Sequence, residues 1–259
     1  MNNLYNLTYQ ELLNNCNSYN EYHTIFNEQL EASRPLQEFI DWADENNISE
    51  SYVPRDINEL KNLTSLDLSN NHLTNLPESI GNLINLTELD LSENELTKLP
   101  ESIGNLTELT KLWIYKNELT SLPESIGNLT ELTEFSLREN KLTSLPESIG
   151  NLTELTKLWI YKNELTSLPE SIGNLTELTL FNISNNNITT LPSSIENLQS
   201  SIKQILQDEV SWINTKKQDK EESYEQYLND FPNGLHKDEA VREKEKTFSL
   251  FGKIVDFFN

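Results

Sequence analysis

The stretch LTKLWIYKNELTSLPESIGNLTE, Leu109–Glu131, recurs without a single change at Leu155–Glu177. Four other 23-residue units follow the same pattern and begin at Leu63, Leu86, Leu132 and Leu178. An incomplete unit, VPRDINELKN, occupies residues 53–62 and precedes them. A fixed period over this many copies predicts a solenoid, a fold in which each unit packs only against its neighbours.

Apolar side chains recur at seven positions of each unit. In the quoted copy they are Leu109, Leu112, Ile114, Leu119, Leu122, Ile126 and Leu129. The period-two spacing of Leu112 and Ile114 predicts a short strand. Seven buried side chains stabilise less than the ordering of 23 residues costs in conformational entropy, so one unit cannot fold alone. Stacking on the neighbouring units must supply the difference.

A column of asparagines follows the predicted strands at the ninth position of every unit. Its members are Asn71, Asn94, Asn117, Asn140, Asn163 and Asn186. A buried carboxamide has two donors and an acceptor, so each asparagine can bond backbone groups of its own unit and of the adjacent one. A glycine recurs at the nineteenth position of the first five units, whereas the sixth has Glu196 there. That departure predicts a transition to a different structure after the sixth unit.

The pattern LxxLxLxxNxLxxLPxxIxxLxx resembles the leucine-rich repeat family, and its LPxxI half resembles the intracellular Ras-group subtype found in plants, animals and many bacteria. The resemblance covers about residues 53–198. It implies an α/β solenoid with a parallel β-sheet on its concave side. It also implies a non-catalytic module that binds a protein or a peptide.

Residues 1–52 lack the repeat and are expected to form an N-terminal helical cap, because the terminal coils of a solenoid would otherwise expose core. Helical spacing occurs in three stretches, Tyr9 to Asn14, Tyr22 to Leu30 and Leu36 to Asp44. For the third stretch, Ser33 is the predicted N-cap and Pro35 lies in the predicted first turn.

Residues 199–259 are expected to form a C-terminal helical segment, in which Ile202 to Ile213 has the spacing of one helix. Ser223 to Val241 resembles the YxxYLxxFPxGxHxxEA helix-turn-helix unit of tetratricopeptide-like bacterial proteins. The matching residues are Tyr224, Tyr227, Leu228, Phe231, Pro232, Gly234, His236, Glu239 and Ala240. An apolar stripe through Phe248, Phe251, Val255 and Phe258 is expected to pack against the same segment.

The composition excludes several classes of function. The formal net charge of −23 opposes binding to nucleic acid or to anionic membranes. Cys16 is the single cysteine, and with three histidines the chain offers no metal, cofactor or catalytic motif that we recognise. No apolar run is long enough for a membrane span. We expect a cytoplasmic protein, or a secreted or surface protein if a signal segment has been removed.

The candidate binding site is the exposed face of the predicted strands. Positions 3, 5 and 7 of the unit point to this concave face and carry Lys111, Trp113, Tyr115, Arg138, Lys157, Trp159 and Tyr161. Two Trp–Tyr pairs thus flank Arg138, and these three residue types dominate the energetics of interfaces. The lysines, with Lys116 and Lys162 at position 8, suit an acidic or amphipathic partner, although Glu134 and Glu139 dilute that charge.

Three alternatives stay open from the residues alone. In the first, the aromatic side chains are copies left by duplication that cover one another and Arg138. Aromatic platforms also stack sugars, so a glycan-binding surface protein is a second alternative. The third is a bacterial effector or adaptor that acts through its C-terminal helices. The identity of the ligand and the oligomeric state are not encoded in these patterns.

Overall fold

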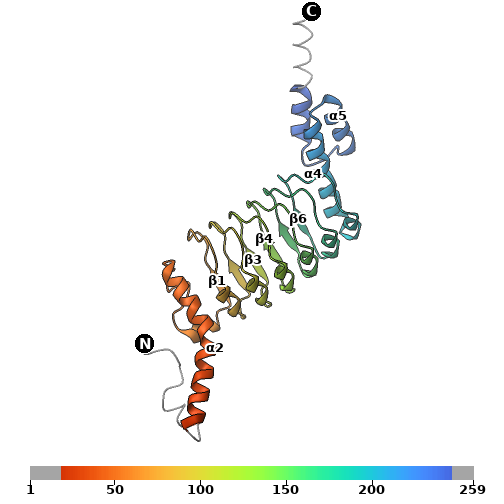
Figure 1. Cartoon of the computed structure of the whole chain (residues 1–259). Helices are drawn as coiled ribbons and strands as arrows, with labels where there is room; N and C mark the ends of the chain where they lie inside the picture. Colours follow the sequence, from red (N-terminus) through yellow and green to blue (C-terminus); the bar gives the residue numbers. More distant parts are fainter. Residues whose placement is uncertain (1–18, 247–259) are drawn as a thin grey trace, which may run out of the picture.

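The structure is a computed structural model that describes the backbone of residues 19–246, and the side chains from residue 31 onward except those of residues 32 and 221. Stacked coils form a curved array with helices at both ends (Figure 1). Strands line one side of the array, and short helical turns line the opposite side.

Six strands form one parallel sheet in the order β1 to β6. They are β1 (Ser65–Asp67), β2 (Glu88–Asp90), β3 (Lys111–Trp113), β4 (Glu134–Ser136), β5 (Lys157–Trp159) and β6 (Leu180–Asn182). The register advances by one unit per strand, so Leu112 lies between Leu89 and Phe135. The middle residue of every strand is buried, as the period-two spacing predicts. The predicted leucine-rich repeat solenoid is therefore confirmed.

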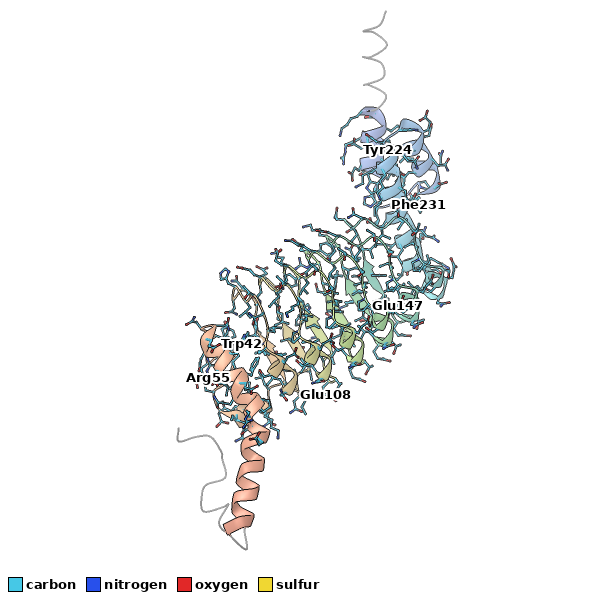
Figure 2. All side chains as sticks on the ribbon, in the orientation of Figure 1. Trp42, Arg55, Glu108, Glu147, Tyr224 and Phe231 are labelled. Carbon is cyan, nitrogen blue, oxygen red and sulfur yellow. The ribbon has the colours of Figure 1, made fainter. Side chains whose placement is uncertain are left out.

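The convex side consists of six 3-10 turns. They are η1 (Glu78–Asn82), η2 (Glu101–Asn105), η3 (Glu124–Asn128), η4 (Glu147–Asn151), η5 (Glu170–Asn174) and η6 (Ser193–Asn197). A proline precedes each turn, where its missing N–H costs nothing. Glu147, labelled in Figure 2, accepts a hydrogen bond from the Ser171 N–H of the next coil. The same kind of bond from Ser193 and Ser194 holds the pKa of Glu170 below its usual value.

The leucines and isoleucines of the coils form one continuous core. It extends beyond the coils at both ends, from Leu36 in the N-terminal helix to Val210 in the C-terminal one. Positions such as Leu112, Ile114 and Leu129 are 0% exposed, although each belongs to a coil that could not bury them alone. The flanking helices therefore complete the burial of the terminal coils.

The asparagine column forms the predicted ladder. The Asn117 side-chain nitrogen donates to the backbone carbonyl oxygens of Leu91 and Ile114 at 2.9 and 3.2 Å. The Asn117 side-chain oxygen accepts from Leu96 N–H at 3.0 Å. The same pattern recurs at Asn94, Asn140, Asn163 and Asn186. The residue before each asparagine has a positive φ, 53° at Lys116, which turns the chain inward after the strand. Each coil therefore relies on the following coil for buried backbone hydrogen bonds.

The recurring glycine is required by close stacking. A Cβ atom on Gly127 would lie 2.6 Å from Ser148 Cβ and would overlap the Ser148 carbonyl oxygen as well. The φ angle is not the reason, because no described glycine has a positive φ. Glu196 fits at the same position of the sixth unit since no further coil packs there, and α4 (Ser200–Gln218) begins four residues later. The predicted transition after the sixth unit is confirmed.

The N-terminal helix differs from the prediction. One helix, α2 (Tyr19–Glu45), replaces two separate stretches and contains Pro35 in its interior. The proposed N-cap at Ser33 is therefore wrong. Helix α2 continues through Ser33 and Pro35 because Phe39 and Ala43, both 0% exposed, hold the following turns against the first coils. A short helix, α3 (Ile57–Lys61), leads into the coils, and the predicted helix Tyr9 to Asn14 lies outside the described residues.

The C-terminal segment packs α4 against α5 (Glu221–Asp230) and a helix that includes residues 237–246. Figure 2 shows Tyr224 and Phe231 in this bundle. Trp212, Tyr224, Tyr227 and Ala240 form its buried core, which agrees with a helix-turn-helix unit. The tetratricopeptide-like resemblance remains a prediction, and the stripe from Phe248 to Phe258 lies outside the described residues.

Asp208 is a buried carboxylate that joins these helices. One of its oxygens accepts from the Tyr227 hydroxyl at 2.5 Å, and the other accepts from Leu235 N–H at 2.6 Å. Burial and the contact with Asp208 raise the pKa of Tyr227 well above its usual value. Burial likewise raises the pKa of Tyr224 to about 12, with Asp219 adding to the shift. Both tyrosines therefore stay neutral hydrogen-bond donors at ordinary pH.

The ladder predicts that Asn117→Ala lowers the free energy of unfolding by about 1–3 kcal/mol, because it leaves buried backbone groups of two coils unpaired. Chemical denaturation measures the loss. Glu118→Ala is the control and should change stability by less than about 0.5 kcal/mol, since the Glu118 pair with Lys141 is exposed. Equal denaturation midpoints for the two variants would contradict the role of the asparagine.

The glycine column predicts that Gly127→Ala destabilises the chain by about 1–3 kcal/mol, because the added methyl group forces η3 and η4 apart. Glu196→Ala changes the same position of the last unit, where no coil follows, and should be near neutral. Thermal unfolding of both variants tests this. A stable Gly127→Ala variant would show that the coils can separate without cost.

Candidate binding face

The strands place the predicted site residues on one face of the sheet. Trp113 on β3 and Trp159 on β5 are half-buried and flank Ser136 on β4, in register. Tyr115, Arg138 and Tyr161 occupy the equivalent positions two residues farther along the three coils. Alternate residues of a strand face opposite sides of the sheet, so these side chains face away from the leucine core.

Seven residues line a shallow hollow of about 590 Å³ on this face: Trp113, Tyr115, Ser136, Arg138, Trp159, Tyr161 and Asn182. Five of the seven predicted site residues are therefore brought together. Lys111 and Lys157 lie beside the hollow on the same strands and do not line it.

Ser136 and Asn182 are the lining residues that the sequence prediction missed. Both occupy the position of the unit at which Trp113 and Trp159 stand, so the repeat alignment could have found them. Ser136 is only 4% exposed and forms the floor between the two tryptophans. A small side chain between two large ones is what hollows the face.

Arg138 lies between the two tyrosines. Its guanidinium carbon is 3.9 Å from the ring centre of Tyr115 and 5.8 Å from that of Tyr161. A guanidinium within about 6 Å of an aromatic ring is attracted to the ring face. Arg138 also donates to the neighbouring Glu139 carboxylate at 3.0 Å. These contacts hold the arginine between the tyrosines and partly neutralise it.

Every lysine of the candidate face is paired with a glutamate of the preceding coil. The pairs are Lys111–Glu88 at 2.7 Å, Lys116–Glu93 at 2.9 Å, Lys157–Glu134 at 2.8 Å and Lys162–Glu139 at 3.4 Å. The hydrogen bond that Lys111 donates to Glu88 raises the pKa of Lys111, and the one that Lys116 donates to Glu93 raises the pKa of Lys116. Four glutamates thus face four lysines and Arg138, with Glu139 shared between Lys162 and Arg138, so the face carries little surplus positive charge and gives an acidic partner little support.

The C-terminal helices bring together one ionisable pair near an aromatic ring. His236 Nε2 lies 3.0 Å from Glu209 Oε1, and the imidazole stacks on Trp212 with ring centres 5.2 Å apart. Glu209 is 5% exposed and Trp212 is 1% exposed, so these contacts hold the turn after α5 in place. Among the side chains that the structure describes, no three His, Cys, Asp or Glu residues gather as metal ligands would. No described helix has the length and apolar character to cross a bilayer.

Family models match most of the repeat region. A model described as a leucine-rich repeat region matches residues 40–161, and one described as a leucine-rich repeat matches residues 177–198. With the parallel sheet and the asparagine ladder, these matches define the class, and the chain belongs to the leucine-rich repeat proteins. No curated protein matches the chain.

Solved structures with similar coils come from plants and bacteria. The ectodomain of the Arabidopsis thaliana membrane receptor kinase GASSHO1/SCHENGEN3, in complex with CASPARIAN STRIP INTEGRITY FACTOR 2, is 32% identical with a TM-score of 0.50, over 54% of this chain and 17% of that one. The plant peptide hormone receptor RGFR1, in complex with RGF2, is 40% identical with a TM-score of 0.49, over 57% and 25%. A leucine-rich repeat protein of Leptospira interrogans is 34% identical with a TM-score of 0.47, over 54% and 43%.

This chain therefore spans less than half the length of each of these proteins. Because 432 chains of solved structures match, the similarity identifies the repeat architecture and does not select one function.

The paired charges predict that Glu134→Lys lowers the free energy of unfolding by about 1 kcal/mol, because it places three lysine side chains next to one another on β3, β4 and β5. Glu134→Gln is the control, since it removes the attraction without adding repulsion. Denaturation at low and at high salt measures both, and 1 M salt should reduce the difference between them. A Glu134→Lys variant as stable as the Gln variant at low salt would contradict the pairing.

Proposed function

We propose that the chain is a non-catalytic module that binds a protein or peptide on the concave face of its sheet, with Trp113, Tyr115, Arg138, Trp159 and Tyr161 as the main contacts. The observation that carries the proposal is the aromatic hollow of about 590 Å³. Tryptophan, tyrosine and arginine offer large, rigid contact areas and provide most of the binding energy in interfaces. Here they gather on a face that the fold does not need for its core.

A solved structure also supports a role in binding a protein or peptide. The Arabidopsis thaliana ectodomain that shares these repeats was solved in complex with CASPARIAN STRIP INTEGRITY FACTOR 2. That protein is much longer than this chain, so its binding partner is not carried over. What it supports is the use of a leucine-rich repeat solenoid for binding.

We propose further that the three-part organisation predicted above describes the chain, with helical caps over residues 1–52 and 199–259 around the solenoid of residues 53–198. The continuous core supports this, because Leu36 and Phe39 at one end and Ile202 and Leu206 at the other pack on the terminal coils. Asn214 of α4 also donates to the Thr189 carbonyl oxygen of the last coil at 2.9 Å.

A displayed library of random peptides, panned against the full chain, tests the proposed function. Trp113→Ala and Trp159→Ala should each weaken the binding of the recovered peptides by about 2 kcal/mol, because each substitution removes a large contact surface. Calorimetry measures the affinity, and the melting temperature should stay nearly unchanged because neither side chain belongs to the core.

Asp67→Ala is the matched control, since Asp67 faces the same side on β1 but does not line the hollow. The proposal fails if a variant with both tryptophans replaced binds the recovered peptides as tightly as the parent chain. A glycan array run in parallel distinguishes peptide binding from the sugar-binding alternative. That alternative requires that the chain bind glycans and recover no peptides.

A further inference from the structure

Two identical coils surround a different one at the centre of the candidate face. Trp113 and Tyr115 of one coil are repeated as Trp159 and Tyr161 two coils later. The coil between them presents two different residues to these pairs. Arg138 lies between the tyrosines, whereas Ser136 lies between the tryptophans. The face thus has two aromatic slots of the same construction, one filled and one open.

Arg138 shows what such a slot holds. Its guanidinium lies within 3.9 Å of one ring centre and 5.8 Å of the other, which brings both tyrosines into the range of a cation–π contact. Neighbouring strands of a sheet lie about 4.8 Å apart, so side chains two strands apart are separated by about 10 Å. A cation midway between them lies about 5 Å from each ring, inside the limit of about 6 Å.

The same arithmetic applies to the open slot above Ser136. The serine side chain is short and 4% exposed, so it leaves the space between the two indole rings free. Indole attracts cations more strongly than phenol does. The Lys111 ammonium already lies 5.9 Å from the Trp113 ring, and its hydrogen bond to Glu88 draws it toward β2, on the side away from Ser136.

The charge of the chain also favours a cation in the open slot. The lysines beside the slot are neutralised by Glu88 and Glu134, and Asp90 stands next to Trp113 in the register of the sheet. The whole chain carries a formal charge of −23, which attracts a cationic partner over long range and repels an acidic one. Arg138, two residues after the end of β4, is the cation that lines the hollow, and it is bonded to Glu139.

We propose that the space between Trp113 and Trp159 receives an arginine side chain of the partner polypeptide, held between the two indoles above Ser136 as Arg138 is held between the two tyrosines. This inference rests on the proposed function and adds the chemistry of the bound residue. The partner is accordingly a basic protein or peptide with an exposed arginine.

The test uses N-acetyl-arginine amide and its neutral isostere N-acetyl-citrulline amide as probes. Indole N–H resonances of the full chain report binding, with Trp113→Phe and Trp159→Phe variants to assign the two signals. The arginine probe should shift both resonances and bind at least about fivefold more tightly than the citrulline probe. Equal affinity of the two probes, or no shift with either, overturns the inference.

Ser136→Arg provides the second arm. It supplies the slot with its own guanidinium and should abolish the shifts caused by the arginine probe, whereas Ser65→Arg, on the same face at the edge strand β1, should leave them intact. Persistent binding to a folded Ser136→Arg variant overturns the inference. Should that variant fail to fold, the comparison of the two probes on the parent chain still decides.

The library of the previous subsection separates the two proposals. Recovered peptides that depend on Trp113 but contain no arginine refute the slot and leave the proposed function standing. Recovered peptides whose affinity falls at least fivefold when one arginine becomes citrulline support both. Binding that survives replacement of both tryptophans refutes both.

Discussion

The hydrogen bonds between consecutive asparagines and the neighbouring backbone are the constraint on which the solenoid depends. Each carboxamide bonds groups of the coil before it, so a coil is complete only when the next coil is in place. The last coil has no successor, and Asn214 of α4 donates to its Thr189 carbonyl oxygen instead. The C-terminal helix is therefore tied to the last coil by a hydrogen bond to a different backbone group from those that the ladder uses.

A second constraint follows from the parallel register of the sheet. Identical units would stack like charges at the spacing of adjacent strands, which is destabilising. At the lysine positions of the face the chain avoids this, because lysine coils alternate with glutamate coils, so that Lys111 meets Glu88 and Lys157 meets Glu134. The same alternation keeps Trp113 and Trp159 two strands apart, with Ser136 between them. Charge pairing and the open aromatic slot thus have one origin.

Much of the fold could be predicted because its period is visible in the sequence. The phase of the leucines predicts which residues enter the core, and it places Trp113 and Trp159 on the opposite face. The prediction at Ser33 failed because a local capping signal was judged without the packing that extends α2 through Pro35. Asn182 was missed because its side chain is small, although it neighbours Trp159 in register. Glu134 and Glu139 were expected to dilute the charge of the lysines, whereas Glu88 and Glu93 were not considered, although they lie 23 residues before Lys111 and Lys116 and pair with them.

The alternation gives the solenoid a natural unit of growth that is twice its structural period. Insertion of one more copy of Leu109–Glu131 beside an existing copy would satisfy the asparagine ladder, yet it would set lysine against lysine. A block of two coils, 46 residues beginning at Leu132, would preserve both the ladder and the charge pairing. Each such block would also add one further serine between two tryptophans. Length variants that arise by duplication should therefore differ in even numbers of coils, and every added pair would lengthen the candidate face by one slot.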